Sequence, residues 1–318
     1  MPPASGAVVM GTAILSVDLT IDGHETLSRA LFGVAAAVWV GLAGLLAGRV
    51  LRDRPRLRHE ATSPAALTGV AGTAVLGVRM GLLGWYGAAA ALHAVALVLW
   101  LLLVPPVLRG WATPTVGVSF VLAVSTESLA VLAAVVAVGE DAAWLAAAAL
   151  IPLALGLAAY LFVLARFDLR QLRTGRGDHW VAGGALAIAA LACGRVAEAA
   201  QALAPLHGLA DGLGTASLVL WAAALAWLPI LVAAELAEPR LGYDARRWST
   251  VFPVGMYTAC SFVVGKVEGA GGLVDFARVW IWVGLAVWAL VAAGLVRRAL
   301  AIWRAGDATR QRRAAPGA

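Results

Sequence analysis

The chain has 318 residues, of which 62% are hydrophobic and only 13% are charged, and its mean hydropathy is +0.86. This balance excludes a water-soluble domain and indicates an integral membrane protein. The formal net charge of +6 is typical of membrane proteins with basic cytoplasmic loops, so we infer no nucleic-acid partner from it.

Ten apolar segments follow one another along the chain, and most are long enough to span a bilayer. No loop is long enough for a soluble domain, so we expect one all-α transmembrane domain over residues 1–303 and a basic cytoplasmic tail over residues 304–318. The first segment has no basic residue before it, which favours a retained helix over a secretory signal. The segments run Ala4–Leu19, Leu27–Leu51, Ala65–Leu83, Tyr86–Leu108, Gly117–Val138, Ala142–Phe167, Trp180–Ala200, Leu213–Leu236, Ser249–Val267 and Phe276–Ala299.

Charges alternate from one loop to the next. Arginines gather in every second loop and in the tail, and most acidic residues gather in the loops between them. Since basic loops remain in the cytoplasm, this pattern predicts ten helices with both termini cytoplasmic. The basic side holds Arg49, Arg52, Arg54, Arg56, Arg58, Arg109, Arg166, Arg170, Arg173, Arg176, Arg240, Arg246, Arg247, Arg297, Arg298, Arg304, Arg310, Arg312 and Arg313. The opposite side holds Asp18, Asp22, Glu25, Glu140, Asp141, Asp211, Glu268 and Asp275, with Arg29, Arg79, Arg195, Lys266 and Arg278.

The odd-numbered segments differ from the even-numbered ones. They are shorter and richer in Gly, Ser and Thr, and they carry the intramembrane charges. Residues 11–17 (GTAILSV) and 72–78 (GTAVLGV) are identical at five of seven positions. A repeat of this kind predicts five helical hairpins, each pairing a small, polar inner helix with an apolar outer one. Short small-residue motifs that arose separately for helix packing would look similar.

The stretch Trp248–Lys266 is long enough to span a bilayer, but it contains a proline and several small polar residues. Pro253 lacks a backbone N–H, so we expect the helix to bend near Phe252 and to place a bulky ring at the bend. Gly255 and Gly265 keep the helix thin. These features are typical of a helix that packs on all sides or lines a cavity.

Three runs of sequence, in this order and spacing, carry a resemblance to a known family. They are FVLAVSTESLA at 120–130, WVAGGALAI at 180–188 and WSTVFPVGMY at 248–257. They resemble the tellurite-resistance/dicarboxylate transporter family, which includes bacterial TehA-type permeases, fungal malate and sulfite transporters, and plant guard-cell slow anion channels. The resemblance covers nearly the whole chain. We expect the protein to lie in a bacterial plasma membrane.

The resemblance also implies an architecture and a gate. Members form homotrimers in which each protomer has its own pore, with the five odd helices in an inner ring and the five even helices outside them. A phenylalanine of the ninth helix occludes the pore in the family, and the matching residue here is Phe252, followed by Pro253. Phe262 lies ten residues further on, about 15 Å along a helix, and matches the position less well.

Small and hydroxyl-bearing residues of the inner helices are the expected pore lining. The predicted lining is Gly11, Thr12, Gly72, Thr73, Ser125, Thr126, Glu127, Gly184 and Gly255. Glu127 departs from the family pattern, in which a neutral residue, typically glutamine, is expected. It falls near the membrane midplane, where an ionised carboxylate would cost about 2.5–3.5 kcal/mol and would repel an anion. We therefore expect Glu127 to be protonated, or hydrogen-bonded among Ser125, Thr126 and Ser128.

Three basic residues lie near the outer ends of odd segments, namely Arg79, Arg195 and Lys266. A ring of positive charge at an outer mouth would raise the local anion concentration. The alternative is that these side chains anchor the interface, or that Arg195 pairs with Glu198 and Lys266 with Glu268.

These features together predict a transmembrane anion channel or permease that passes small anions through a pore occluded by phenylalanine. The alternative is a proton-coupled transporter of C4-dicarboxylate, sulfite or tellurite oxyanions, with Glu127 as the proton site. We expect no enzyme, because no nucleophile–base pair is recognisable. We also expect no metal or other cofactor, since no metal-ligand spacing and no phosphate-binding loop occurs. The expected partners are an inorganic or dicarboxylate anion and the lipid bilayer.

Overall fold

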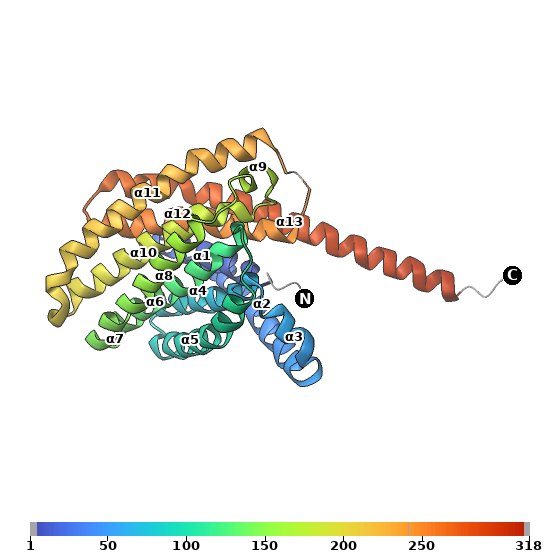
Figure 1. The fold of residues 1–318 in the computed structure, drawn as a ribbon, viewed down its shortest axis with the longest axis horizontal. Coiled ribbons are helices and arrows are strands. Elements are labelled where there is room, and N and C mark those ends of the chain that lie inside the picture. The colour runs from blue at the N-terminus through green and yellow to red at the C-terminus, as the bar shows by residue number, and fades with distance from the viewer. Residues whose placement is uncertain (1–4, 241, 315–318) are drawn as a thin grey trace.

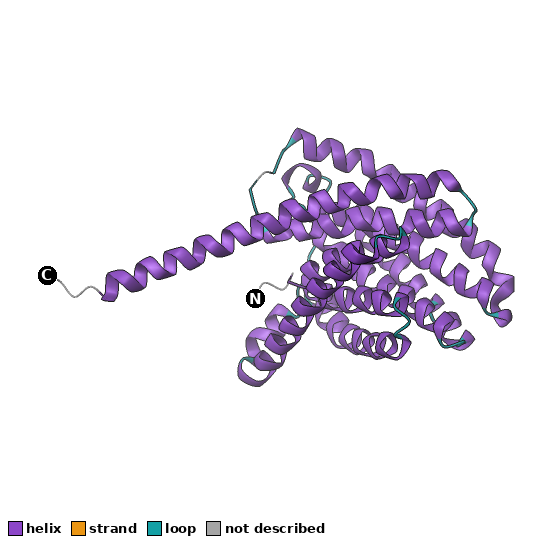
Figure 2. Ribbon diagram, turned by 180° about the vertical axis from the view of Figure 1, so that it is seen from behind, coloured by secondary structure: helices purple, strands orange, loops and turns teal. Residues whose placement is uncertain are grey.

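The computed structural model describes residues 5–240 and 242–314, with side chains as far as residue 304. The predicted start of the first segment at Ala4 and residues 315–318 of the predicted tail lie outside the described residues. Within these ranges the protein is a bundle of helices without strands (Figure 1, Figure 2). This confirms the predicted all-α class.

The helices follow the predicted apolar segments closely. Nine helices of the described ranges are long and apolar enough to cross a membrane, and α1 is a shorter apolar helix of 16 residues. The elements are α1 Gly6–Ile21, α2 Glu25–Arg52, α3 Arg54–Glu60, η2 Pro64–Leu67, α4 Thr68–Leu82, α5 Tyr86–Arg109, η3 Gly117–Phe120, α6 Val121–Gly139, α7 Ala143–Ala148, α8 Leu150–Leu164, α9 Gln171–Thr174, η4 Asp178–Trp180, α10 Val181–Ala202, η5 Ala204–Leu209, α11 Ala210–Ala237, η6 Ala245–Arg247, α12 Trp248–Val267 and α13 Gly271–Ala314.

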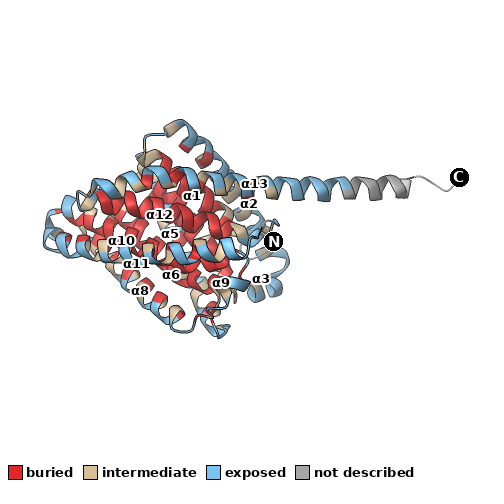
Figure 3. Ribbon diagram, turned by 90° about the horizontal axis from the view of Figure 1, so that it is seen from above, coloured by how far each residue is buried: buried red, intermediate tan, exposed pale blue. Residues whose placement is uncertain are grey.

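Burial divides the long helices into two groups. The spans that contain α4, α6, α10 and α12 are 78% to 94% buried, and nearly all of α1 is buried as well. The spans that contain α2, α5, α8, α11 and α13 are only 11% to 28% buried. Figure 3 shows the buried segments at the centre of the molecule and the exposed segments around them. The exposed helices are apolar, so their surface suits hydrocarbon and not water.

The five buried helices form a closed ring. Helix α1 packs against α4, α4 against α6, α6 against α10, α10 against α12, and α12 back against α1. Each also packs against the exposed helix that follows it in the chain, which is α2, α5, α8, α11 or α13. Glycines with positive φ, Gly23 (+85°), Gly84 (+79°) and Gly269 (+64°), allow three of these reversals to be short.

The chain departs from the predicted segments at two places. The basic stretch after α2 is not a plain loop, because Asp53 caps the short helix α3 by accepting a hydrogen bond from the Arg56 backbone N–H at 3.3 Å. Helix α13 has 44 residues and continues past the predicted segment end at Ala299. At 1.5 Å per residue it is about 66 Å long, so it extends well beyond the rest of the bundle, as Figure 1 shows.

Candidate functional site

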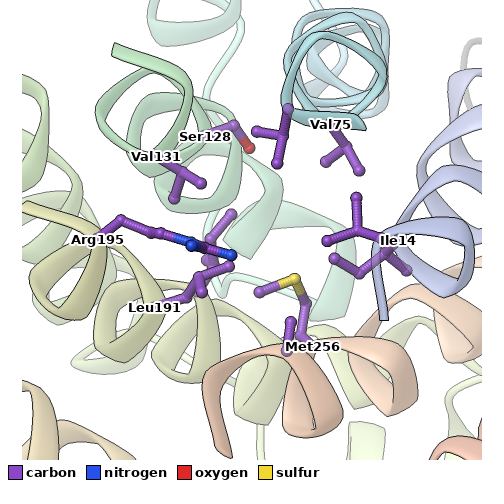
Figure 4. Close-up of a pocket in the computed structure, with 11 residues that line it drawn as sticks. Ile14, Val75, Ser128, Val131, Leu191, Arg195 and Met256 are labelled. Atoms are coloured by element: carbon purple, nitrogen blue, oxygen red, sulfur yellow. The ribbon is translucent and has the colours of Figure 1, made fainter. Parts of the chain in front are cut away.

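A narrow cavity lies within the ring of buried helices (Figure 4). Each of the five helices contributes at least two side chains to its wall. The space open to the centre of a water molecule is about 20 Å³, which is enough for about one water. The wall is formed by Ile14 and Val17 of α1, Val75 and Val78 of α4, Ser128 and Val131 of α6, Ile188, Leu191 and Arg195 of α10, and Met256 and Ala259 of α12.

The wall residues recur at equivalent positions. On α1, α4 and α6 they lie two and five positions after a threonine, which is Thr12, Thr73 or Thr126. On α10 and α12 the first two wall residues have the same three-residue interval. The repeat seen between residues 11–17 and 72–78 therefore places equivalent side chains on one common surface.

The wall is apolar except for two side chains. Ser128 donates a hydrogen bond to the Val124 carbonyl oxygen at 2.7 Å, so its own oxygen faces the cavity mainly as an acceptor. Arg195 extends from α10 into the cavity region in Figure 4 and brings a positive charge to the wall. In so small and apolar a space, a fixed cation has a larger influence than it would have in water.

Arg195 belongs to a charge cluster near the end of α10. Its Nη1 donates to Glu198 Oε2 at 2.8 Å, which confirms the predicted pair, and Lys266 Nζ lies 3.1 Å from Glu198 Oε1. The predicted pairing of Lys266 with Glu268 is wrong, because α10 and α12 pack side by side and bring Glu198 to the lysine. Arg195 Nε has no partner in the described part of the chain. Two cations thus share one carboxylate, and the cluster keeps a net positive charge.

Phe252 is 1% exposed and lies on α12, which is helical without interruption through Pro253. It precedes the wall residue Met256 by four positions, so it lies on the same side of α12, one turn nearer the basic end. The equivalent positions on the other buried helices are Met10, Ala71, Val124 and Gly184, and all are buried. Of these positions Ala71 and Gly184 carry the smallest side chains, and Pro253 packs against Gly184.

The hydroxyls of the three predicted lining threonines face the outer helices. Each accepts a hydrogen bond from an outer tryptophan indole N–H, at 2.9–3.0 Å. The pairs are Trp288 with Thr12, Trp39 with Thr73, and Trp100 with Thr126. The expectation that these hydroxyls line the cavity is wrong, because an indole N–H inside a membrane must find an acceptor and finds it here.

The predicted lining glycines are sites of close contact between buried helices. A Cβ on Gly11 would lie 3.0 Å from Val251, and one on Gly72 would lie 3.2 Å from the Gly6 carbonyl oxygen. A Cβ on the predicted lining residue Gly184 would lie 2.7 Å from Pro253, and one on Gly255 would lie 2.7 Å from Ile14. These positions let the helices approach closely, as small residues do in membranes.

Glu127 points away from the cavity, toward α8. Its carboxyl lies against Gly156, where an added Cβ would be 3.1 Å from Oε1. Neither carboxyl oxygen has a hydrogen-bond partner among the residues that the structure describes. The expected bonds from Ser125, Thr126 and Ser128 do not form, because these hydroxyls donate to carbonyl oxygens of their own helix. Of the two expectations for Glu127, hydrogen bonding by its neighbours is therefore wrong.

Arg79 does not lie at an open mouth. Its side chain is 0% exposed, and its Nε donates to the hydroxyls of Ser16 at 3.1 Å and Ser28 at 3.0 Å. Its Nη2 donates to Glu25 at 2.8 Å, and the guanidinium lies 5.8 Å from the centre of the Phe32 ring. Arg79 therefore joins α1, α2 and α4.

Asp18 was predicted on the acidic side of the loops but lies inside α1. It is 0% exposed, and a Cβ on Gly255 of α12 would be 3.4 Å from its Oδ2. Over the described ranges neither carboxyl oxygen has a hydrogen-bond partner. Sequence reasoning missed this buried carboxyl because it stands close to the end of a short segment. The available signal was its position directly after the repeat at residues 11–17, which matches the position of Arg79 directly after residues 72–78.

Membrane channels and transporters line their paths with packed helices, and the five buried helices surround a central cavity in this way. The described residues hold no group of three His, Cys, Asp or Glu side chains that could bind a metal ion.

Comparison with known proteins identifies the family. The family model described as "Voltage-dependent anion channel" (SLAC1) matches residues 1–296, so the chain belongs to the voltage-dependent anion channel family. This confirms the predicted resemblance, and members of this family are channels or transporters. Two proteins of Mycobacterium tuberculosis, strains CDC 1551 / Oshkosh and H37Rv, each called an uncharacterized membrane protein, are similar. Each is 35% identical over 153 residues, which cover 45% of this chain and 77% of the relative. The protein is thus a multi-pass integral membrane protein of an anion channel and transporter family.

Proposed function

We propose that the chain forms an anion channel or permease whose path runs along the axis of the five buried helices. The observation that carries this proposal is the cavity to which all five helices contribute equivalent side chains. In this proposal ten transmembrane helices form five hairpins around the path, with α1, α4, α6, α10 and α12 inside. The small cavity volume favours small inorganic anions over dicarboxylates.

Anion preference would come from Arg195 and from backbone dipoles. The wall is otherwise nearly apolar, so it offers little to hold an anion tightly, which suits rapid passage. Arg195 and Lys266, partly neutralised by Glu198, would raise the anion concentration at the outer end.

Phe252 would be the narrowest point of the path. It shares the cavity-facing side of α12 with Met256, and the facing positions Ala71 and Gly184 are small. Pro253 lies against Gly184, and this contact would hold the turn that carries the ring.

We further propose an orientation, a membrane location and an oligomeric state for the protein. The alternation of loop charges supports cytoplasmic termini, and the similarity to membrane proteins of Mycobacterium tuberculosis supports a bacterial plasma membrane. We also propose a homotrimer, with residues 1–303 as the permeation domain and residues 304–318 as a basic cytoplasmic tail. Helix α13 continues across residue 303, so the boundary marks an exit from the membrane and not a break in the helix.

The gate is tested by removing its ring. Phe252→Ala should raise anion current at least about tenfold, because it removes the largest side chain at its level of the path. Phe→Ala in a packed core costs about 3–5 kcal/mol, and we expect a smaller loss beside a cavity. The measurement is current in planar bilayers, normalised to reconstituted protein.

Phe262→Ala is the matched control, because Phe262 is also buried in α12 but lies on a different side of the helix. It should change stability more than current. A folded Phe252→Ala protein that conducts no better than the parent would make Phe252 a packing residue.

A second candidate is a proton-coupled carrier of C4-dicarboxylate, sulfite or tellurite oxyanions that uses Glu127. The observation in its favour is a fully buried carboxyl without a hydrogen-bond partner in the described structure. Its position against α8 favours the channel, since a proton site that faces away from the path is poorly placed for coupling. Uphill uptake driven by a pH gradient would support the carrier, and currents that reverse at the anion's equilibrium potential would support the channel.

A further inference from the structure

A second, larger cavity lies on the outside of the bundle, near its arginine-rich end. It is an open groove of about 890 Å³ between α2, α3 and α5, and the first turns of α1 and α4 form its floor. None of the groove's residues belongs to the wall of the central cavity. The groove is therefore separate from the central cavity.

The groove walls change from apolar to basic along the helix axes. Toward the middle of the molecule they are made of leucines, which include exposed side chains such as Leu45 (49%) and Leu102 (66%). The leucines are Leu42, Leu45 and Leu46 of α2, and Leu99, Leu102 and Leu103 of α5. An apolar groove of this kind between two membrane helices fits hydrocarbon chains.

The rim of the groove is basic. Arg49 and Arg109 lie in the last turns of α2 and α5, and Arg58 lies on α3. Arg49 is neutralised by Glu60 at 2.8 Å. Arg58 and Arg109 are exposed and form no ion pair within the described ranges. Two uncompensated guanidinium groups therefore stand at the open end of an apolar groove.

The depth of these groups agrees with a lipid. Helix α2 has 28 residues and is about 42 Å long, so it exceeds the roughly 30 Å hydrocarbon core and its last turns reach the headgroup region. The leucines lie about one to three turns deeper than Arg49 and Arg109, at the level of acyl chains. Basic pockets between membrane helices on the cytoplasmic side bind anionic headgroups.

We infer that the groove between α2, α3 and α5 binds an anionic phospholipid, with its headgroup at Arg58 and Arg109 and an acyl chain along the leucines. A second copy of the chain fits less well, because a partner surface would have to supply two carboxylates and bury the exposed arginines. The leaflet is cytoplasmic if the proposed orientation holds, but lipid binding does not depend on the proposed permeation.

The inference is tested by photolabelling in lipid nanodiscs. The full-length protein is reconstituted in nanodiscs of phosphatidylcholine doped with a trace of phosphatidylglycerol, or in parallel of phosphatidylcholine, that carries a diazirine on one acyl chain. We expect crosslinks on the leucine-lined parts of α2 and α5. Labelling by phosphatidylglycerol should exceed labelling by phosphatidylcholine about tenfold, because each arginine favours an anionic headgroup.

The double variant R58Q/R109Q should lose this preference and still be labelled by phosphatidylcholine. The control R297Q/R298Q removes two exposed arginines from α13, away from the groove, and should keep the preference. Equal labelling by both lipids in the parent would overturn the inference, as would an equal loss in both variants. Absent labelling together with a smaller oligomer in R58Q/R109Q would also overturn it, because the groove would then be an interface between copies. Anion current in the same samples reports on permeation separately.

Discussion

The inward and outward faces of the buried helices differ in what they hold. The inward faces form a nearly apolar wall to which Arg195 brings a charge. The outward faces hold Thr12, Thr73 and Thr126, each bonded to an outer tryptophan, and Glu127 packed against α8. Polar residues in the buried helices therefore mainly join the two layers, and polarity alone does not mark the path.

Two arginines of the buried helices show the same difference. Arg79 faces outward, and its partners Ser16, Ser28 and Glu25 compensate its charge. Arg195 lies in the cavity wall, where it shares the carboxylate of Glu198 with Lys266. Arg79 therefore joins helices away from the cavity, whereas Arg195 brings its charge to the cavity wall.

Arg195→Gln gives the largest functional effect that we expect from this comparison. Anion current through the Phe252→Ala background should fall about tenfold, since about 1.4 kcal/mol of lost attraction changes occupancy by that factor. Glu198 keeps Lys266 as a partner, so the fold should survive. The check is the current and the anion-to-cation permeability ratio in planar bilayers.

Lys266→Gln is the control, because Lys266 is 77% exposed and contacts the same carboxylate without reaching the cavity wall. It should change the current less than twofold. Equal effects of both variants would show that only the overall potential matters and not the position of Arg195.

Glu127→Gln tests whether an outward-facing carboxyl takes part in transport. We expect passive anion current within about twofold of the parent at each pH, because the side chain does not reach the cavity wall. Burying an ionised carboxylate here would cost about 2.5–3.5 kcal/mol, so replacement by a neutral side chain should not lower stability. Liposome flux with and without a pH gradient is the measurement.

Glu140→Gln serves as the control for Glu127→Gln, since Glu140 is exposed in the turn after α6. A loss of pH-driven uptake in Glu127→Gln, but not in Glu140→Gln, would support the carrier and count against the channel.

Thr73→Val gives the smallest expected effect. It removes the acceptor for the Trp39 indole N–H and should cost about 1 kcal/mol, which corresponds to a fall of roughly 2 °C in the melting temperature. Anion current should not change. Thr258→Val is the control, because the Thr258 hydroxyl is buried without a partner in the described residues and its removal should be neutral or stabilising. A thermal unfolding series in detergent would show whether the two differ.

The sequence predicted the helices well because membrane spans are defined by length and apolar composition. It also distinguished the buried helices from the exposed ones, since residues 11–17 and 72–78 are rich in small residues. The Arg195–Glu198 pair was predictable because the two residues lie three apart on one helix.

The rotation of each buried helix about its axis was not predictable. A helix that is buried all round has no amphipathic pattern to show which side faces the cavity. The sequence therefore does not show whether Thr12 or Ile14 faces it. The contacts of Arg79 with Ser28 and of Lys266 with Glu198 join different helices, and only the packed bundle brings these residues together.

The central claim, that the path follows the inward faces, is tested most directly by cysteine modification. In a Phe252→Ala background without Cys193 and Cys260, single cysteines replace Val78 in the cavity wall and Thr73 on the opposite face of the same helix. A small anionic methanethiosulfonate is then applied while current is recorded. We predict that Val78→Cys loses most of its current irreversibly and that Thr73→Cys is unaffected. Block of Thr73→Cys with Val78→Cys unaffected would contradict the account.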